Sequence, residues 1–595
     1  MRRTLFGLAL TVLALGLAAN NAIAQDGNDR GHEFHFVPGS IVLTRTVYVG
    51  NASTVTIGEN LPPGCVGSTN SAQNNVTVQV QSSDSNGNPL GTFLAVALPT
   101  CGYASDNGEY PNLEDSHNVW NNAGTDGDFG ITSPIFLDNL TDDGHLLGTL
   151  PIPTDQMVTS FSSKSELALN RSIDGKSLTF VGYRGGPGCP VIDFSSGTGV
   201  QGTTSGPVSP TAPSLIDVSA SNTPGLCDPT NQAIASSESS PFPTAYYRAV
   251  AEVDADGHIK FTDNNAYSGD NDRAAIKASN GLYYMAGNDN SGNIPKKNVA
   301  TTVTGFDLAH ATGAELLVPD AIPPVAPNID MIGYFVLSGD KAGKDTNFRG
   351  LTIFNNTVYV TKGSGSNGLN SVFQVGSSGV LPTGSQASLI AEPINPLPGF
   401  PQFADAAAST SSTTGDFPFG VWFANANTLY VCDEGTGTYV PNQEINGQTN
   451  VADADTLANA GLQKWVLENG TWTRVYVLQN GLNLGVPYGI RNYPAALDPA
   501  TDGCRNIAGR VNHDGTVTIW AVTSTVSTNG DTGADPNKLV MVNDVLGAKS
   551  LSSVRDPWLE TFETVRSARA GEAFRGVALA PVDEPGRDDD GRNHN

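Results

Sequence analysis

The chain has 595 residues, with 58 acidic and 31 basic side chains and a formal net charge of −27 at pH 7. A charge of this sign repels nucleic acid and anionic membranes, so neither is an expected partner. The 66 glycines and the many Asn, Ser and Thr residues, together with few helix-forming blocks, favour short strands joined by turns.

The first 24 residues predict a secretory signal peptide. Arg2 and Arg3 precede an apolar run over 5–19, and Ala22-Ile23-Ala24 supplies the cleavage pattern. The run is short for a membrane span, and no later stretch is apolar enough to be one. We therefore expect a secreted or periplasmic chain without a membrane span, ending in a flexible polar tail over 583–595.

A repeat follows along the chain. In each copy a small or apolar segment leads to a turn of Asn, Asp or Gly and then to a strand of β-branched and aromatic residues, which predicts an antiparallel hairpin. Five full copies lie at 165–183, 272–287, 348–362, 418–433 and 507–523, and a sixth at 574–581 stops after its first strand. Further strands are expected at 302–308, 315–318, 461–467 and 471–478, so that each repeat predicts a four-stranded propeller blade.

The incomplete last copy predicts how the ring closes. Segments 41–49, 134–140 and 145–152 read as three strands without an inner strand of their own, and joining them to the last copy completes a blade and removes free sheet edges. This predicts an all-β chain with one six-bladed β-propeller over 25–582, carrying insertions at about 51–122 and 185–240. Seven blades is the alternative count, if the longest gap between repeats contains two blades that are counted here as one. Two β-sandwich domains are the alternative fold, but they do not explain the split terminal blade.

The chain has six cysteines, an even number that predicts disulfides in an exported protein. None has the Cys-x-x-Cys spacing of a zinc or redox site. We expect sequential pairing, with Cys65–Cys101 and Cys189–Cys227 each closing one insertion. Cys432 ends the second strand of one blade and Cys504 precedes the first strand of the next, so a Cys432–Cys504 bond would join neighbouring blades.

Several segments resemble a group of uncharacterised exported bacterial β-propeller proteins. They are PIFLDNLTDDGHLLGTLPIP from Pro134, SELALNRSIDGKSLTFVGY from Ser165, NAYSGDNDRAAI from Asn265, FRGLTIFNNTVYVTKGSGSNG from Phe348, GLQKWVLENGTW from Gly461 and FRGVALAP from Phe574. The resemblance implies export and the propeller fold but no activity. More loosely, PFGVWFANANTLYVCDEG from Pro418 looks like segments of regucalcin/gluconolactonase-type and phytase-like esterase propellers, a pattern common to many propellers.

The first residues of the innermost strands predict a rim around the central channel. These are Glu166, Arg273, Arg349 and Arg575, with Phe419 and Ile507 between them. Three guanidinium groups near one axis could clamp a carboxylate or phosphate group. The alternative is that the rim charges only satisfy one another, with Asp272 and Glu572 as partners.

Metal binding is a second hypothesis for the same region. Asp/Asn-rich loops at 126–128, 254–257 and 263–272 offer oxygen ligands for Ca²⁺, and Asp270, Asp272 and Glu166 are the candidate ligands. No segment has full EF-hand spacing, and Asp-Gly and Asn-Gly usually form turns. No nucleophile elbow, Walker loop or dinucleotide-binding fingerprint is present in its proper context. The tryptophans are expected mainly to pack between blades.

These observations favour an exported propeller that binds a small molecule, glycan or protein partner across one face, without catalysis. One alternative is a lactonase- or phosphoesterase-like hydrolase with a metal at the channel mouth. The other is a structural protein of the envelope or matrix.

Overall fold

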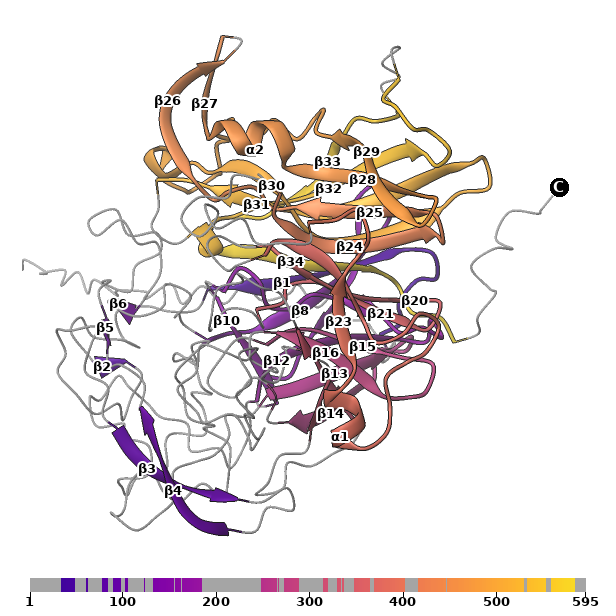
Figure 1. Cartoon of the computed structure of the whole chain (residues 1–595). Coiled ribbons are helices and arrows are strands. Elements are labelled where there is room, and N and C mark those ends of the chain that lie inside the picture. The colour runs from indigo at the N-terminus through magenta and orange to yellow at the C-terminus, as the bar shows by residue number, and fades with distance from the viewer. Residues whose placement is uncertain are drawn as a thin grey trace, which may run out of the picture.

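The computed structural model describes residues 34–48, 132–184, 248–287, 314–335, 347–401 and 416–583, with short gaps inside these ranges, and separate strands between 60 and 123. Six antiparallel sheets form the blades of a β-propeller (Figure 1). The innermost strands touch in the order β34, β11, β15, β20, β24, β30 and again β34, which closes the ring. The predicted all-β fold with six blades is confirmed.

Blades 1 to 3 contain the N-terminal half of the ring and its closure. Blade 1 consists of β34 (Glu572–Leu579), β1 (Ile41–Val47), β8 (Ile135–Leu140) and β9 (Leu146–Pro151). Blade 2 consists of β11 (Asn170–Arg171), β12 (Ser177–Arg184), β13 (Arg248–Asp254) and β14 (Ile259–Asn264), with β10 (Met157–Ser160) and β7 (Thr132–Ser133) added beside β12. Blade 3 consists of β15 (Asp272–Lys277), β16 (Tyr283–Gly287), β17 (Ala314–Leu317) and β18 (Ile329–Met331).

Blades 4 to 6 complete the ring. Blade 4 consists of β20 (Leu351–Phe354), β21 (Thr357–Lys362), β22 (Ser371–Val375) and β23 (Pro393–Pro396), with β19 (Tyr334–Phe335) parallel to β23 and α1 (Gln386–Ile390) before it. Blade 5 consists of β24 (Pro418–Asn425), β25 (Thr428–Asp433), β28 (Gly461–Glu468) and β29 (Thr471–Leu478). Blade 6 consists of β30 (Ala500–Val511), β31 (Thr516–Val526), β32 (Lys538–Val545) and β33 (Glu563–Ser567).

Three further groups of elements lie in connections. Between β25 and β28 the chain forms a hairpin of β26 (Tyr439–Ile445) and β27 (Gln448–Ala452), followed by α2 (Ala454–Asn459). Single 3-10 turns occur at Ala495–Leu497 and Thr532–Ala534. Between β1 and β8, β3 (Thr77–Ser83) pairs with β4 (Pro89–Ala97), and β2 (Asn60–Leu61), β5 (Gly102–Ala104) and β6 (Asn122–Ala123) form a small sheet.

Blade 1 is built from both ends of the chain, as the unfinished last repeat predicts. β34 pairs antiparallel with β1, with Ile41 opposite Leu579 and Val47 opposite Glu572 (Figure 1). The hydroxyl of Thr44 accepts a hydrogen bond from the Gly576 amide at 2.6 Å and donates to the Leu167 carbonyl of blade 2 at 3.2 Å. One threonine therefore connects the two chain ends with the neighbouring blade.

The two ends of the channel differ in their connections. At one end, tight turns join the first and second strands of blades, as at Asn355 and Asn356, whose φ angles of 48° and 56° suit a two-residue hairpin turn. At the other end, which we call the mouth, the innermost strands begin and the long connections 49–131, 185–247 and 434–460 leave the blades.

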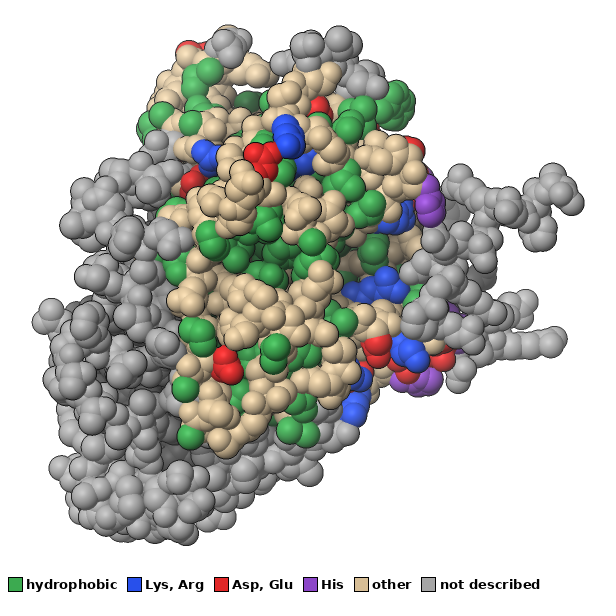
Figure 2. Space-filling model, turned by 45° about the vertical axis from the view of Figure 1, so that its right-hand side comes forward, with side chains coloured by type: hydrophobic (Ala, Val, Ile, Leu, Met, Phe, Trp, Pro, Cys, Tyr) green, Lys and Arg blue, Asp and Glu red, His purple; other side chains and the backbone are tan. Residues whose placement is uncertain are grey.

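Hydrophobic side chains fill the spaces between blades. One cluster lies at each of the six interfaces in the described part of the ring. Trp465, Trp472 and Trp520 are buried in these clusters. The Phe400 ring stacks on the Trp465 ring, with their centroids 3.9 Å apart. Trp558 differs, with 71% of its surface exposed. On the face drawn in Figure 2, charged side chains lie scattered among hydrophobic and uncharged ones.

A disulfide joins Cys432 in β25 to Cys504 in β30, with Cα atoms 5.2 Å apart. This confirms the predicted bond between blades 5 and 6. The cysteines are 72 positions apart, and closing a loop of that length stabilises the folded chain by about 4 kcal/mol in the chain-entropy model. Cys65, Cys101, Cys189 and Cys227, and most of the two predicted insertions, lie outside the described residues.

In the described part of the chain, no helix is long and apolar enough to cross a membrane.

Candidate functional site: charged groups at the channel mouth

The innermost strands approach one another so closely at the mouth that glycine is required. A Cβ atom on Gly350 would lie 2.0 Å from the Phe419 carbonyl oxygen, and one on Gly420 would lie 2.2 Å from the Arg505 carbonyl oxygen. Arg349, Phe419 and Arg505 therefore hold equivalent positions in blades 4, 5 and 6. The repeat pattern predicts Ile507 at this position in blade 6, but the structure places Arg505 there.

Two of the predicted rim arginines brace loops of the mouth. Arg273 is buried and donates to the Ser165 hydroxyl at 2.9 Å, to the Phe348 carbonyl at 2.8 Å and to the Asn347 amide oxygen. Arg575 is buried and donates to the carbonyls of Phe161 and Gly533. Both guanidinium groups thus connect neighbouring blades through uncharged oxygens, and these bonds involve neither another rim charge nor Asp272 or Glu572.

Glu166 is buried in blade 2 and accepts a hydrogen bond from the Thr159 hydroxyl at 3.0 Å. The next residue, Leu167, is buried with a φ of 60°, a conformation that a leucine rarely adopts. Strained backbone of this kind persists only where the surroundings impose it, and it concentrates at functional sites.

Glu434, which follows β25 in blade 5, accepts a hydrogen bond from Arg505 of blade 6 at 3.0 Å. Both side chains are almost fully buried. Burial raises the pKa of Glu434, but the positive charges of Lys164, Arg505 and Arg349 outweigh burial, so that the pKa lies below its usual value. These three cations belong to blades 2, 6 and 4, so positive charges from alternate blades act on one carboxylate, and Arg505 contacts it directly. We call Lys164, Arg349, Glu434 and Arg505 the mouth cluster.

Three buried aspartates lie near the mouth cluster. Burial raises the pKa of Asp502 and of Asp535 to about 7, and it raises the pKa of Asp433 well above its usual value. Asp502 accepts from the Gly437 amide at 2.8 Å, and Asp535 accepts from the Tyr493 hydroxyl at 3.2 Å. Because burial favours the neutral carboxyl, these acids offset the mouth cations less than their number suggests.

The structure does not bring the predicted Ca²⁺ ligands together in the part that it describes. Asp272 is buried beside Arg248, with its Oδ1 3.8 Å from the Arg248 Nε, and burial raises its pKa to about 6. Glu166 is hydrogen-bonded to Thr159 as described above, and Asp270 lies outside the described residues. Among those residues, no three His, Cys, Asp or Glu side chains gather in a way that could hold a metal ion.

Fold and site together define a six-bladed β-propeller with converging cations at one end of its channel. No protein-family model matches the chain, and no curated protein matches it. Among solved structures, one described as "glucose dehydrogenase" is 11% identical, covers 69% of this chain and 91% of its own, and has a TM-score of 0.28. A second, "Crystal structure of glucose dehydrogenase", is 11% identical, covers 66% and 89%, and has a TM-score of 0.27. Similarity at this level carries no argument about function.

Proposed function

We propose that this chain is an exported β-propeller that binds a small anion, through a carboxylate or phosphate group, at the channel mouth. The observation that supports the proposal is the buried ion pair of Glu434 with Arg505, 3.0 Å apart, whose carboxylate also feels the positive charges of Lys164 and Arg349. The field of these cations overcomes the cost of burying a carboxylate, which is the property an anion site needs. Glu434 therefore acts as an internal carboxylate that a ligand can replace or extend.

The arrangement of the chain supports the mouth over the opposite end. The connection from β25 to β28, with the hairpin of β26 and β27 and with α2, leaves blade 5 at the mouth. The rest of the chain carries a strong negative charge, so a local group of cations is the feature that favours anions. The predicted signal peptide supports export.

Isothermal titration calorimetry with inorganic phosphate and with citrate tests the proposal. We expect saturable binding by the oxidised full-length mature chain, weakened at least tenfold in Lys164→Met. Lys164 is half-buried, and its interaction with Glu434 is electrostatic, so this variant should fold. Glu434→Gln should bind the anion more tightly, because it removes the internal competitor.

The matched control is Arg510→Met. Arg510 lies on β30, as Arg505 does, but at the far end of the strand, where it pairs with Asp142. The Arg510→Met variant should bind phosphate and citrate with the same affinity as the unchanged chain. Absence of binding by the unchanged chain, or equal loss in Lys164→Met and Arg510→Met, would contradict the proposal.

A further inference from the structure

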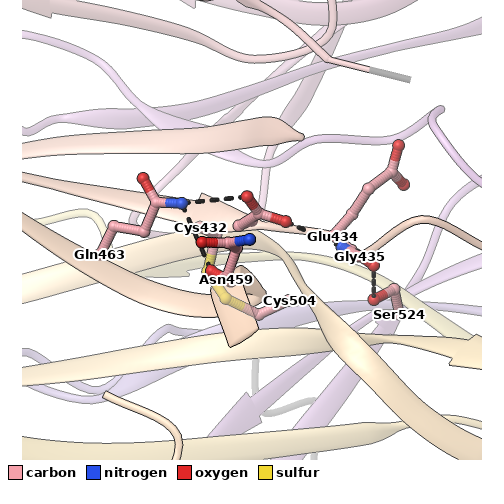
Figure 3. The surroundings of a disulfide bond; sticks show 8 residues. Cys432, Glu434, Gly435, Asn459, Gln463, Cys504 and Ser524 are labelled. Carbon is pink, nitrogen blue, oxygen red and sulfur yellow. Dashed lines mark hydrogen bonds between the residues drawn. A yellow bond between two sulfur atoms is a disulfide. The ribbon is translucent and has the colours of Figure 1, made fainter. Parts of the chain in front are cut away.

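The disulfide lies next in the chain to Glu434 and Arg505, the two residues of the mouth cluster that form an ion pair. Cys432 is two residues before Glu434, and Cys504 immediately precedes Arg505. The bond therefore fixes blade 5 to blade 6 at the point where the Glu434–Arg505 pair forms. In Figure 3 the Glu434 side chain points away from the disulfide, so the bond does not itself occupy the site.

The backbone around the disulfide shows how closely the two blades must approach. A Cβ on Gly503 would lie 2.2 Å from the Asp433 carbonyl oxygen, and one on Gly435 would lie 2.4 Å from the Asp502 carboxylate. Ser524 adds a hydrogen bond of 2.6 Å from its hydroxyl to the Glu434 carbonyl (Figure 3). Glycine at both contacts permits this proximity, and the covalent bond maintains it.

The same segment supplies the amides that anchor the acids of the mouth. The Gly435 amide donates to Asp433 Oδ1 at 2.9 Å, and the Gly437 amide donates to Asp502 Oδ2 at 2.8 Å. Asp502 belongs to blade 6, and Gly437 lies in the connection between β25 and β28 of blade 5. A separation of the two blades at this end would therefore break the hydrogen bond from the Gly437 amide to Asp502. It would also move Arg505 away from Glu434.

We infer that the Cys432–Cys504 disulfide is the positioning element of the mouth cluster, so that only the oxidised chain presents Glu434 and Arg505 together. In its binding consequence this inference rests on the anion-binding function proposed above. A chain with two thiols keeps the ring, because six interface cores hold the blades, but its mouth opens between blades 5 and 6. Anion binding is then restricted to an oxidising compartment.

The test replaces the cysteines, because both are fully buried and a reductant would have to open the fold to reach them. Cys432→Ala/Cys504→Ala removes the bond, and Cys432→Val/Cys504→Ala removes it while refilling the cavity. Hydrogen exchange measured by mass spectrometry should show the 433–437 amides exchanging at least tenfold faster in both variants. Exchange in 272–287 of blade 3 should not change. Phosphate affinity should fall at least tenfold, because Arg505 moves away from Lys164 and Arg349, with which it would hold the anion.

Val250→Ala serves as the control for general destabilisation, since Val250 is buried at the interface of blades 2 and 3. It should leave both exchange at 433–437 and phosphate affinity unchanged. Unchanged exchange in the cysteine variants, or global unfolding of both, would overturn the inference. If the unchanged chain binds no phosphate, the proposed function fails, while the exchange comparison still decides whether the disulfide positions the mouth.

Discussion

A buried ion pair between blades 5 and 6 gives a sharp test of how the ring is held together. Lys464 Nζ lies 3.0 Å from Asp544 Oδ2, and both side chains are fully buried. Asp544 also accepts from the hydroxyls of Tyr430 at 2.5 Å and Tyr476 at 2.9 Å, while Lys464 donates to the Val545 carbonyl at 2.6 Å. Every charged atom of the pair thus has a partner.

Lys464→Met leaves the Asp544 carboxylate buried with tyrosines alone. Breaking a buried pair by removing one partner costs about 3–5 kcal/mol, and we expect a loss of that size in the free energy of unfolding. Urea unfolding followed by tryptophan fluorescence measures it. Lys464→Met/Asp544→Asn removes both charges and keeps an acceptor for the tyrosines. The loss of unfolding free energy in this double variant should be smaller, by at least about 1.5 kcal/mol, than the sum of the losses in Lys464→Met and Asp544→Asn.

The same two blades provide the control. Lys549 of blade 6 pairs with Glu468 of blade 5, but both side chains are more than half exposed. Lys549→Met should therefore cost less than about 1 kcal/mol. The reasoning is refuted if Lys464→Met costs no more than this control, or if the single changes at Lys464 and Asp544 are simply additive.

Three further outcomes follow from the geometry. Burial raises the pKa of Asp535 to about 7, above its value in the unfolded chain. Between about pH 4 and pH 7 the unfolded chain releases this proton while the folded chain keeps it, so the free energy of unfolding falls as pH rises. Asp535→Asn should flatten that part of the curve of unfolding free energy against pH. Gly350→Ala places a Cβ against the Phe419 carbonyl and should cost about 3 kcal/mol or more by urea unfolding, whereas Gly547→Ala, which meets nothing within 4 Å, should cost far less. A chain ending at 571 loses β34 and should be aggregated in size-exclusion chromatography, whereas one ending at 583 should elute as the full chain does.

The fold was predictable because its signals are local. Asn-Gly and related turns mark the hairpins, and alternating apolar residues set their register. The unfinished repeat at 574–581 revealed the composite blade, since a propeller leaves no inner strand unpaired. The Cys432–Cys504 pairing followed from the positions of both residues at the same end of adjacent blades.

The mouth cluster was harder to predict because it depends on features outside the repeat. The pairing of β30 with β31 shifts between Cys504 and Ile507, which displaced the alignment and hid Arg505. Glu434 follows the end of its hairpin, and Lys164 precedes the first repeat, so neither occupies a repeat position. Only the ring arrangement brings blades 2, 4, 5 and 6 to one point. The Asp433-Glu434 pair at the end of β25 is the signal in the sequence that could have indicated Glu434.

The threonine bridge in blade 1 bears on the timing of folding. Thr44 bonds to Gly576, 532 positions further along the chain. At about 5–20 residues per second, ribosomes need roughly half a minute to two minutes to make the intervening chain. Throughout that time β1 has no inner neighbour and the ring is an open arc. The final step of folding therefore waits for the last segment to be synthesised, and any factor that shields exposed strand edges has its main task in that interval.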